Sequence, residues 1–187
     1  MTGAAARALA LVVVLAGGVG GDVSASNSPA TGRLSPHWSE VKWPFPLDQW
    51  GTGRAFRCEA DACGVTVNLY LRPKIGFCNC SRGVYDDTEL DRVGDVELLG
   101  PDFIGIGDGR PVTVGWMEGR TRVFNVTGPY QPNASAIAIA FNDKCDVVVA
   151  TVTSDGDLAG SQRAALRFLN TDLVLRWARA ELGSDGS

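Results

Sequence analysis

The segment ASAIAIAFNDKCDVVVATVT, at positions 134–153, holds the clearest secondary-structure pattern of the chain. Its first half alternates alanine with larger apolar residues, which predicts a β-strand whose two faces meet different surroundings. Its second half contains three consecutive valines, 147–149, so both faces of that strand should be buried. Asn142, Asp143 and Lys144 between the halves predict a turn. We therefore expect a central hairpin that pairs 134–141 with 146–153.

The residues after this hairpin predict a helical layer. Apolar residues recur at helical spacing over 161–169 and again over 173–182, and a polar segment at 170–172 can end one helix and start the next. Small side chains let a helix approach a sheet closely, and one face of the hairpin carries only alanines, at positions 136, 138 and 140. We expect the C-terminal helices on this alanine face, with Trp177 as their main anchor.

Upstream segments extend the predicted sheet. We expect a strand over 64–72 that Pro73 ends, a short helix over 86–93, and a second hairpin of 112–117 with 121–126 around residues 118–120. The expected fold class is α+β: an antiparallel β-sheet built from hairpins, with C-terminal helices packed on one face and disulfides as staples.

The N-terminus predicts export. Arg7 precedes a short apolar run that ends in Val23-Ser24-Ala25, a pattern typical of a cleavable signal peptide over 1–25. The run is shorter than the about 20 apolar residues of a spanning helix, so we expect no stable membrane span after cleavage. We expect a flexible leader and aromatic strap over 26–53, a single α+β domain over 54–183 and a tail at 184–187. The excess of arginine over lysine indicates a bacterial protein, periplasmic or secreted.

Composition excludes several classes of function. The net charge of −4 gives no electrostatic basis for binding nucleic acid. The single histidine, His37, excludes sites that need two histidines, and its place beside the leader favours an ordinary surface residue. The glycine-rich segment 105–109 lacks the ending of a phosphate-binding loop, and we interpret it as a loop. Acidic segment 86–97 could gather a cation, but its spacing fits a helix start better. We expect no cofactor, and nothing favours a carboxylate hydrolase.

The five cysteines, all after the signal, predict a disulfide framework: Cys58, Cys63, Cys78, Cys80 and Cys145. The odd number leaves at least one of them unpaired within a monomer. A bond between Cys58 and Cys63 would close a short loop with little strain. A bond between Cys78 and Cys80 would be strained, because their Cα atoms in an extended chain would lie roughly 6.5 Å apart, near the upper limit for a disulfide. We therefore expect Cys145 to bond to Cys78 or Cys80.

The first of two functional hypotheses is based on the cysteine that remains unpaired. Basic residues at positions 72, 74 and 82 flank the Cys-x-Cys pair and should lower a thiol pKa. Cys78, Cys80 and Cys145 could also offer sulfur ligands to a soft metal. This hypothesis describes a thiol redox or metal-handling protein, and its alternative is a structural disulfide with one inert thiol.

The other hypothesis, which we favour, is an exported, non-catalytic binding or accessory domain for an unknown small molecule or protein. It is supported by the lack of nucleophile and cofactor motifs. Trp38, Trp43 and Trp50 lie in a proline-containing strap and could form an aromatic platform for such a ligand. Because most aromatic side chains in proteins are buried, the competing interpretation is that these tryptophans anchor the strap on the domain.

Overall fold

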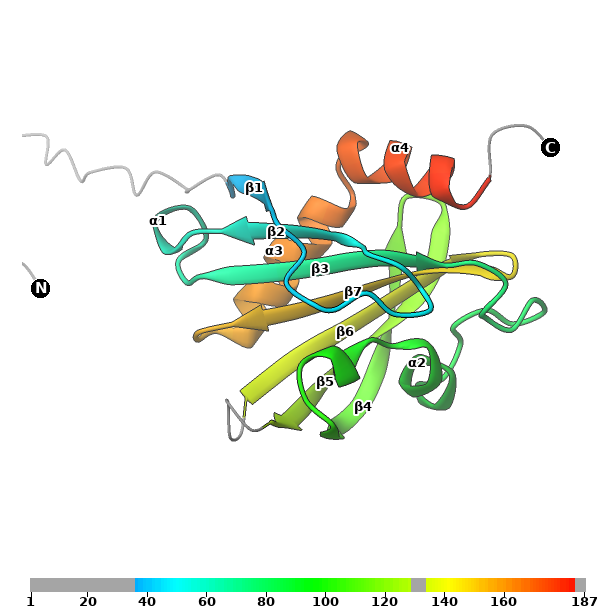
Figure 1. Cartoon of the computed structure of the whole chain (residues 1–187), viewed down its shortest axis with the longest axis horizontal. Coiled ribbons are helices and arrows are strands. Elements are labelled where there is room, and N and C mark those ends of the chain that lie inside the picture. Colours follow the sequence, from blue (N-terminus) through cyan, green and yellow to red (C-terminus); the bar gives the residue numbers. More distant parts are fainter. Residues whose placement is uncertain (1–35, 129–133, 184–187) are drawn as a thin grey trace, which may run out of the picture. The chain divides into compact units, whose positions relative to one another are not determined.

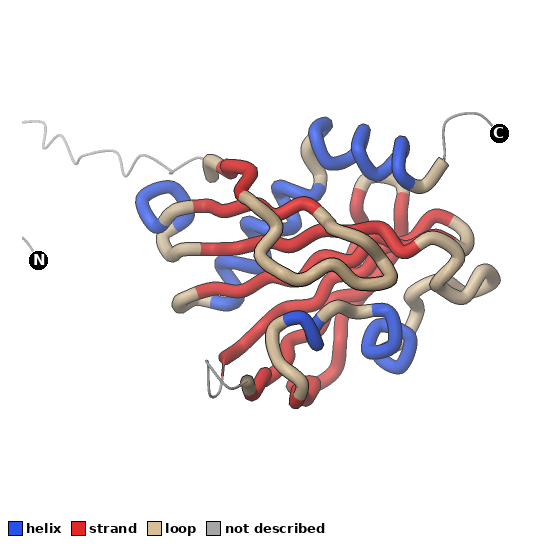
Figure 2. The backbone as a smooth tube through the Cα atoms, viewed as in Figure 1, coloured by secondary structure: helices blue, strands red, loops and turns tan. Residues whose placement is uncertain are grey.

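The computed structural model describes residues 36–128 and 134–183. The predicted signal peptide, the leader up to residue 35 and the tail lie outside the described residues. Seven antiparallel strands form one sheet in the order β1-β2-β3-β7-β6-β5-β4, which together with the helices gives the expected α+β class (Figures 1 and 2). The strands are β1 Trp38–Val41, β2 Arg54–Cys58, β3 Val67–Lys74, β4 Asp102–Val114, β5 Met117–Thr127, β6 Ala134–Asp143 and β7 Asp146–Ser154.

Four α-helices and one 3-10 helix join or follow these strands: α1 Ala60–Cys63, α2 Asp87–Val93, η1 Val96–Leu98, α3 Leu158–Leu169 and α4 Asp172–Glu181. The side chain of Asp86 caps α2 by accepting a hydrogen bond from the amide of Glu89 at 2.8 Å. Helices α3 and α4 are separated at residues 170–171, where the sequence predicts the break.

The central strands β6 and β7 form the antiparallel hairpin that the sequence predicts. Ala140 lies opposite Val149, and the register runs on to Asp143 opposite Asp146. The turn therefore consists of Lys144 and Cys145, slightly later than predicted, and Lys144 adopts a positive φ of 55° there. This turn places Cys145 at the edge of the core, next to the loop that carries the other two cysteines of the region.

Two apolar layers cover opposite faces of the sheet. On one face, α3 and α4 pack against the larger side chains of the central hairpin, including Ile137, Ile139 and Phe141. On the other face, α2 and η1 pack against the alanines at 136, 138 and 140. Figure 1 shows α3 behind the sheet and α2 in front of it. We call these the α3 face and the α2 face.

The expected packing of the C-terminal helices on the alanine face is therefore wrong. Phe168 and Leu169 of α3 bury large side chains, and the isoleucine face supplies partners of matching size. Helix α4 is anchored by Val174, Ala178 and Leu182, which are buried, while Trp177 is only partly buried. Trp177 thus lies at the margin of the core and is not the main anchor that the sequence suggested.

The glycine-rich segment 105–109 is not a loop but part of the edge strand β4. A side chain at Gly105 would collide with the guanidinium of Arg122, and one at Gly109 would collide with the carboxylate of Asp87. The glycines let these long polar side chains from β5 and α2 lie across the strand. The turn between β4 and β5 falls at Gly115 and Trp116, so the predicted turn residues 118–120 belong to β5.

Two further boundaries differ from prediction. Pro73 does not end its strand, because β3 runs on to Lys74 with Pro73 opposite Val148. The strap begins with a short edge strand, β1, whose residues pair antiparallel with β2. Residues 42–53, which follow β1, are irregular apart from an isolated bridge between Asp48 and Gly51. From here on, the name strap refers to residues 42–53.

Candidate functional site

The strap crosses the α2 face of β3 and is held there by aromatic contacts (Figure 1). The Phe45 ring packs edge-on against Tyr70, with 4.8 Å between centroids, and Trp43 packs edge-on against both rings at 5.3 and 6.1 Å. Such edge-to-face arrangements are favourable beyond the apolar area that they bury. They fix Phe45 in a position where its ring stands above the sheet surface.

A buried charge network fixes the same strap from below. Arg72 and Lys74 on β3 are only 1% and 2% exposed, and both contact the carboxylate of Asp95, which is 2% exposed. Lys74 Nζ lies 2.6 Å from Asp95 Oδ1 and also donates to the carbonyl of Val93 at 2.8 Å. Because an unpaired buried charge is very costly, the network requires α2, η1 and β3 to stay together.

Asp48 supplies the second carboxylate of this network from the strap. Both of its carboxylate oxygens accept hydrogen bonds from Arg72 Nη1 at 2.8 Å. Partial burial alone would raise the pKa of Asp48, but the hydrogen bonds from Arg72 and from the Trp50 amide outweigh it and hold the pKa below its ordinary value. The carboxylate of Asp48 is therefore charged at neutral pH, and it ties the strap to the same arginine that holds Asp95.

A groove opens on the α2 face between the strap and η1. Its volume is about 540 Å³. Its walls include the apolar side chains of Phe45, Leu98 and Leu99, and its floor includes polar side chains of β3 and β7. Residues from the strap, β3, η1, β6 and the end of β7 all contribute, so the groove is a product of the tertiary fold. The full lining is Pro44, Phe45, Asn68, Tyr70, Leu98, Leu99, Ala134, Ser135, Thr153, Ser154, Asp155, Gly156 and Leu158.

Hydrogen-bonding groups without charge dominate the groove floor. Asn68 Nδ2 donates to the hydroxyl of Thr153 at 3.4 Å across the β3–β7 pair. Burial raises the pKa of the Tyr70 phenol, and a hydrogen bond to Thr153 opposes this only in part, so Tyr70 remains a neutral hydroxyl group. Among the described residues that line the groove, Asp155 is the one ionisable side chain besides this phenol. The floor can therefore donate and accept hydrogen bonds but offers little charge.

Two buried polar atoms next to Tyr70 lack partners. The indole Nε1 of Trp43 and the hydroxyl of Thr151, opposite Tyr70 in the sheet, have no hydrogen-bond partner among the described residues. Buried polar groups without partners are uncommon in folded proteins. Both residues adjoin Tyr70, since Trp43 contacts its ring edge-on and Thr151 lies opposite it in the sheet.

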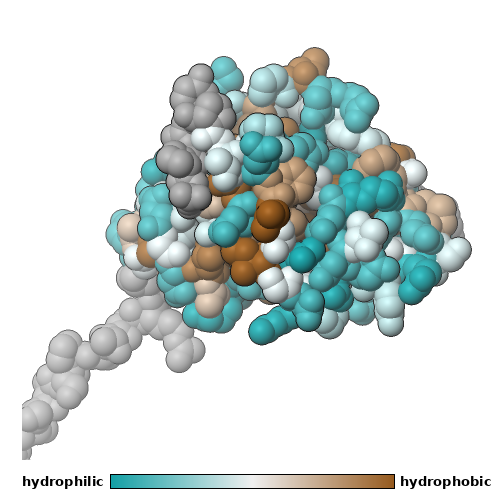
Figure 3. Space-filling view, turned by 90° about the horizontal axis from the view of Figure 1, so that it is seen from below, coloured by the Kyte–Doolittle hydropathy of each residue, from teal (hydrophilic) through white to brown (hydrophobic). Residues whose placement is uncertain are grey.

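Other surface features are less developed as sites. The space-filling view in Figure 3 shows a compact apolar patch within a mostly hydrophilic face. Large apolar side chains are also exposed on the edge strand β4, where Ile104 and Ile106 are 70% and 45% exposed. A hollow of about 610 Å³ beside Ile104 is formed by neighbouring residues of β4 and β5 and the segment before β4. This hollow is lined by two paired strands and the residues before them, whereas the groove is lined by segments that are far apart in the sequence.

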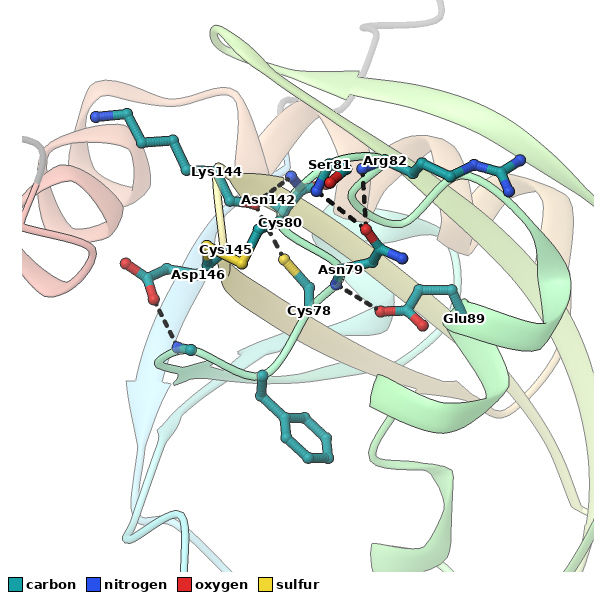
Figure 4. Close-up of a disulfide and its surroundings, with 12 residues drawn as sticks. Cys78, Asn79, Cys80, Ser81, Arg82, Glu89, Asn142, Lys144, Cys145 and Asp146 are labelled. Carbon is teal, nitrogen blue, oxygen red and sulfur yellow. Dashed lines mark hydrogen bonds between the residues drawn. A yellow bond between two sulfur atoms is a disulfide. The ribbon is translucent and has the colours of Figure 1, made fainter.

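The cysteines form two disulfides. Cys58 bonds to Cys63 across α1, with Cα atoms 6.0 Å apart, and Cys80 bonds to Cys145 with Cα atoms 4.1 Å apart. The second bond agrees with the expectation that Cys145 pairs with a member of the Cys-x-Cys segment. Cys78 is the free cysteine, and it is buried. Figure 4 shows its side chain directed toward the turn that carries Lys144 and Cys145.

The environment of Cys78 does not activate the thiol. Its Sγ donates to the carbonyl of Lys144 at 3.2 Å, and its amide donates to the carbonyl of Cys145 at 3.1 Å. Burial, followed by the charges of Glu89 and Asp146, raises the pKa of Cys78 to about 11, and Arg92 opposes this only weakly. The expectation of a lowered pKa is therefore wrong, because Arg72 and Lys74 point into their own network with Asp95 instead of toward the thiol.

The sulfur site for a soft metal lacks its donor set in this structure. Two of the three sulfurs, those of Cys80 and Cys145, are bonded to each other and cannot both act as thiolate ligands. In the described ranges 36–128 and 134–183, no cluster of three or more histidine, cysteine, aspartate or glutamate side chains is arranged to hold a metal ion.

The three tryptophans of the proposed platform do not share one surface. Trp38 stacks on Phe168 of α3, with 4.8 Å between centroids, and so belongs to the α3 face. Trp43 lies on the α2 face against Tyr70, and Trp50 contacts Phe77 at 4.5 Å. All three are partly buried. Only Trp43 adjoins the groove, where it supports the wall formed by Phe45.

The acidic segment 86–97 is largely paired with arginines. Asp87 contacts Arg120, and Asp91 contacts Arg122 at 2.8 Å, which ties α2 to β5. Glu89 contacts Arg92, and this hydrogen bond holds the pKa of Glu89 below its ordinary value. With Asp95 held in the buried network, the carboxylates of this segment serve to fasten α2 and η1 to the sheet. His37 is exposed.

Comparisons with protein-family models, curated proteins and solved structures found no match. Sequence reasoning missed the groove. A signal was present in β3, where Asn68, Tyr70, Arg72 and Lys74 place polar groups on one face of a strand whose other face is apolar. The strap and η1 cover this face and turn it into a groove and a buried charge network.

Proposed function

We propose that the protein is an exported, non-catalytic binding domain whose ligand occupies the groove between the strap and η1. The observation that carries this proposal is the groove itself, with apolar walls and a hydrogen-bonding floor gathered from five separate segments. Ligand sites are commonly hollows of this kind and of this size range. Two disulfides support an oxidising compartment outside the cytoplasm, periplasmic or secreted. No helix in the described residues is long and apolar enough to cross a membrane.

The lining of the groove favours an uncharged ligand with one apolar ring and several hydroxyl groups. Phe45, Leu98 and Leu99 offer surfaces for a ring, and Asn68, Tyr70 and Thr153 offer donors and acceptors. Among the described lining residues, a buried anion would find no cation, and a cation would find only Asp155. Charged ligands would therefore lose hydration without gaining a partner.

A titration followed by nuclear magnetic resonance tests this proposal. The ¹⁵N-labelled full chain, purified after export, is titrated with phenyl β-D-glucopyranoside as a neutral probe and with benzoate and benzamidine as charged controls. We expect the neutral probe to shift the amides of Asn68, Tyr70 and Thr153 at millimolar concentration, with smaller effects from both charged compounds.

A matched pair of variants separates the groove from non-specific binding. Leu98→Arg places a charge in the groove wall and should abolish the shifts. Leu47→Arg adds the same charge to the strap at a side chain that is 75% exposed, and it should leave them unchanged. Equal binding of the neutral probe by both variants, or shifts confined to other surfaces, would contradict the proposal.

A further inference from the structure

The Cys78 thiol lies against the turn whose Cys145 is bonded to Cys80. The loop between β3 and α2 brings Cys78 alongside the β6–β7 turn through the hydrogen bond from its amide to the carbonyl of Cys145. Its Sγ donates to the carbonyl of the preceding residue, Lys144. Cys80, two residues further along the same loop, already holds Cys145. Figure 4 shows the three sulfur-bearing side chains gathered at this turn.

The loop is fixed around the cysteines by side-chain contacts that do not depend on which of them is bonded. The amide of Gly76 donates to Asp146 Oδ1 at 2.6 Å, and the amide of Asn79 donates to Glu89 Oε1 at 2.9 Å. On the far side, the amide of Val84 donates to Asn142 Oδ1 at 3.0 Å. The contacts of Gly76 and Val84 hold the two ends of this loop on β7 and β6, and the contact of Asn79 holds its middle on α2. Both members of the Cys-x-Cys pair are thereby kept near Cys145.

We propose that Cys78, Cys80 and Cys145 form a thiol–disulfide exchange site in which the Cys78 thiolate attacks Sγ of Cys145. A Cys78–Cys145 bond forms, the Cys80–Cys145 bond breaks, and the electron pair of the broken bond leaves on Cys80. The proton lost by Cys78 to solvent is balanced by one taken up by Cys80. The protein holds two disulfides and one thiol before and after the step, so no oxidant or reductant takes part.

The two isomers differ in where the thiol lies. Cys78 is 6% exposed, whereas Cys80 is exposed. Exchange therefore transfers the free thiol from a buried position to the surface, where it can form a mixed disulfide with a disulfide-bearing partner. The loop closed by the new bond is two residues longer than the present separation of 65, so the chain entropy is nearly the same and local contacts set the balance.

Protonation of Cys78 makes the exchange slow at neutral pH. A thiol with a pKa of about 11 is ionised to roughly one part in 10⁴ at pH 7 and one part in 10² at pH 9. Because the thiolate is the attacking species, we expect the exchange rate to rise about 100-fold between these two values. The buried isomer is thus retained under neutral conditions and released by alkali, or by any contact that ionises Cys78.

Non-reducing peptide mapping of the full chain tests the exchange. Protein is incubated at pH 7 and at pH 9, quenched with acid, denatured, alkylated with N-ethylmaleimide and digested. We expect the label on Cys78 at the start, and on Cys80 in a fraction that grows about 100-fold faster at pH 9, at a rate independent of protein concentration. Label that stays on Cys78 alone overturns the proposal. So does scrambling that includes Cys58 or Cys63, since that indicates unfolding, or a rate proportional to concentration.

Two cysteine variants test the same proposal through the disulfides that they contain at equilibrium. Cys80→Ser removes the present partner of Cys145, and we expect a Cys78–Cys145 disulfide in its place. Cys78→Ser is the control and should keep the Cys80–Cys145 bond with no free thiol. A folded Cys80→Ser protein with both remaining thiols free contradicts the exchange. If that variant does not fold, the wild-type mapping decides alone.

Discussion

The guanidinium of Arg72 donates two hydrogen bonds to the carboxylate of Asp95, at 2.5 and 2.8 Å, in a region where both side chains are almost fully buried. Lys74 shares the same carboxylate, and Asp48 completes the charge balance from the strap. Two cations on β3 are therefore matched by one carboxylate from the α2–η1 connection and one from the strap. This network holds together the two segments that form the walls of the groove.

Asp95→Asn should cost about 3–5 kcal/mol of unfolding free energy, because it leaves Arg72 and Lys74 buried with only Asp48 to balance them. The matched control is Glu40→Gln, which breaks the more exposed pair with Arg54 and should cost about 0–1 kcal/mol. Urea unfolding monitored by tryptophan fluorescence measures both. A loss for Asp95→Asn no larger than that of the control would show that the network contributes little to stability.

The two disulfides should differ in their effect on stability. In the chain-entropy relation, the Cys80–Cys145 bond with a separation of 65 stabilises by about 4 kcal/mol, and the Cys58–Cys63 bond with a separation of 5 by about 2 kcal/mol. Replacing both cysteines of each pair by serine, and comparing urea unfolding of the two double variants, checks the order. A larger loss for the Cys58–Cys63 pair would indicate that native contacts, and not loop closure, dominate.

The unfolding free energy should decrease at alkaline pH because the buried Cys78 thiol resists ionisation in the folded state. Its pKa is about 11 in the folded state, above the value of about 8.5 in an unfolded chain. The unfolded state therefore loses the proton first, so this contribution is fully present below pH of about 8.5 and declines as the pH rises toward 11. The difference in unfolding free energy between wild type and Cys78→Ser, measured from pH 7 to 11, isolates the effect. If the unfolding free energies of the two proteins changed with pH in parallel, Cys78 would make no such contribution.

Ala138→Leu distinguishes the two helical layers. The alanine lies on the α2 face near Gly94, so the larger side chain should overpack that layer and cost about 1–3 kcal/mol. Hydrogen exchange should show lost protection in α2, with α3 and α4 largely unaffected. Lost protection in α4 instead would support the packing that the sequence alone suggested.

The sequence was sufficient to predict strands whose buried residues recur at a regular spacing along the chain. The pattern over 64–72 predicted strand β3, and the consecutive valines of β7 predicted a strand buried on both sides. The sequence also predicted the pairing of Cys145 with the Cys-x-Cys segment, because a bond within that segment would be strained and Cys58 can pair with the nearby Cys63. These features depend on neighbours along the chain or on a single covalent constraint.

The choice of sheet face for the C-terminal helices could not be predicted in the same way. Both faces of β6 are apolar, so periodicity does not distinguish the alanine face from the face of Ile137 and Ile139. The groove was hidden for a related reason. Its walls come from the irregular strap and from η1, whose positions depend on the contact of Asp48 and Asp95 with Arg72, and no local pattern reports such distant pairings.

The central claim is that the groove between the strap and η1 binds a neutral ligand with an apolar ring. Intermolecular nuclear Overhauser effects between the full chain and phenyl β-D-glucopyranoside test it most directly, because they report contact between identified protons. We expect effects from the phenyl protons of the probe to the methyl groups of Leu98 and Leu99 and to the ring of Phe45, all of which line the groove. Effects that reach only the exposed isoleucines of β4, or none at saturating probe, would contradict it.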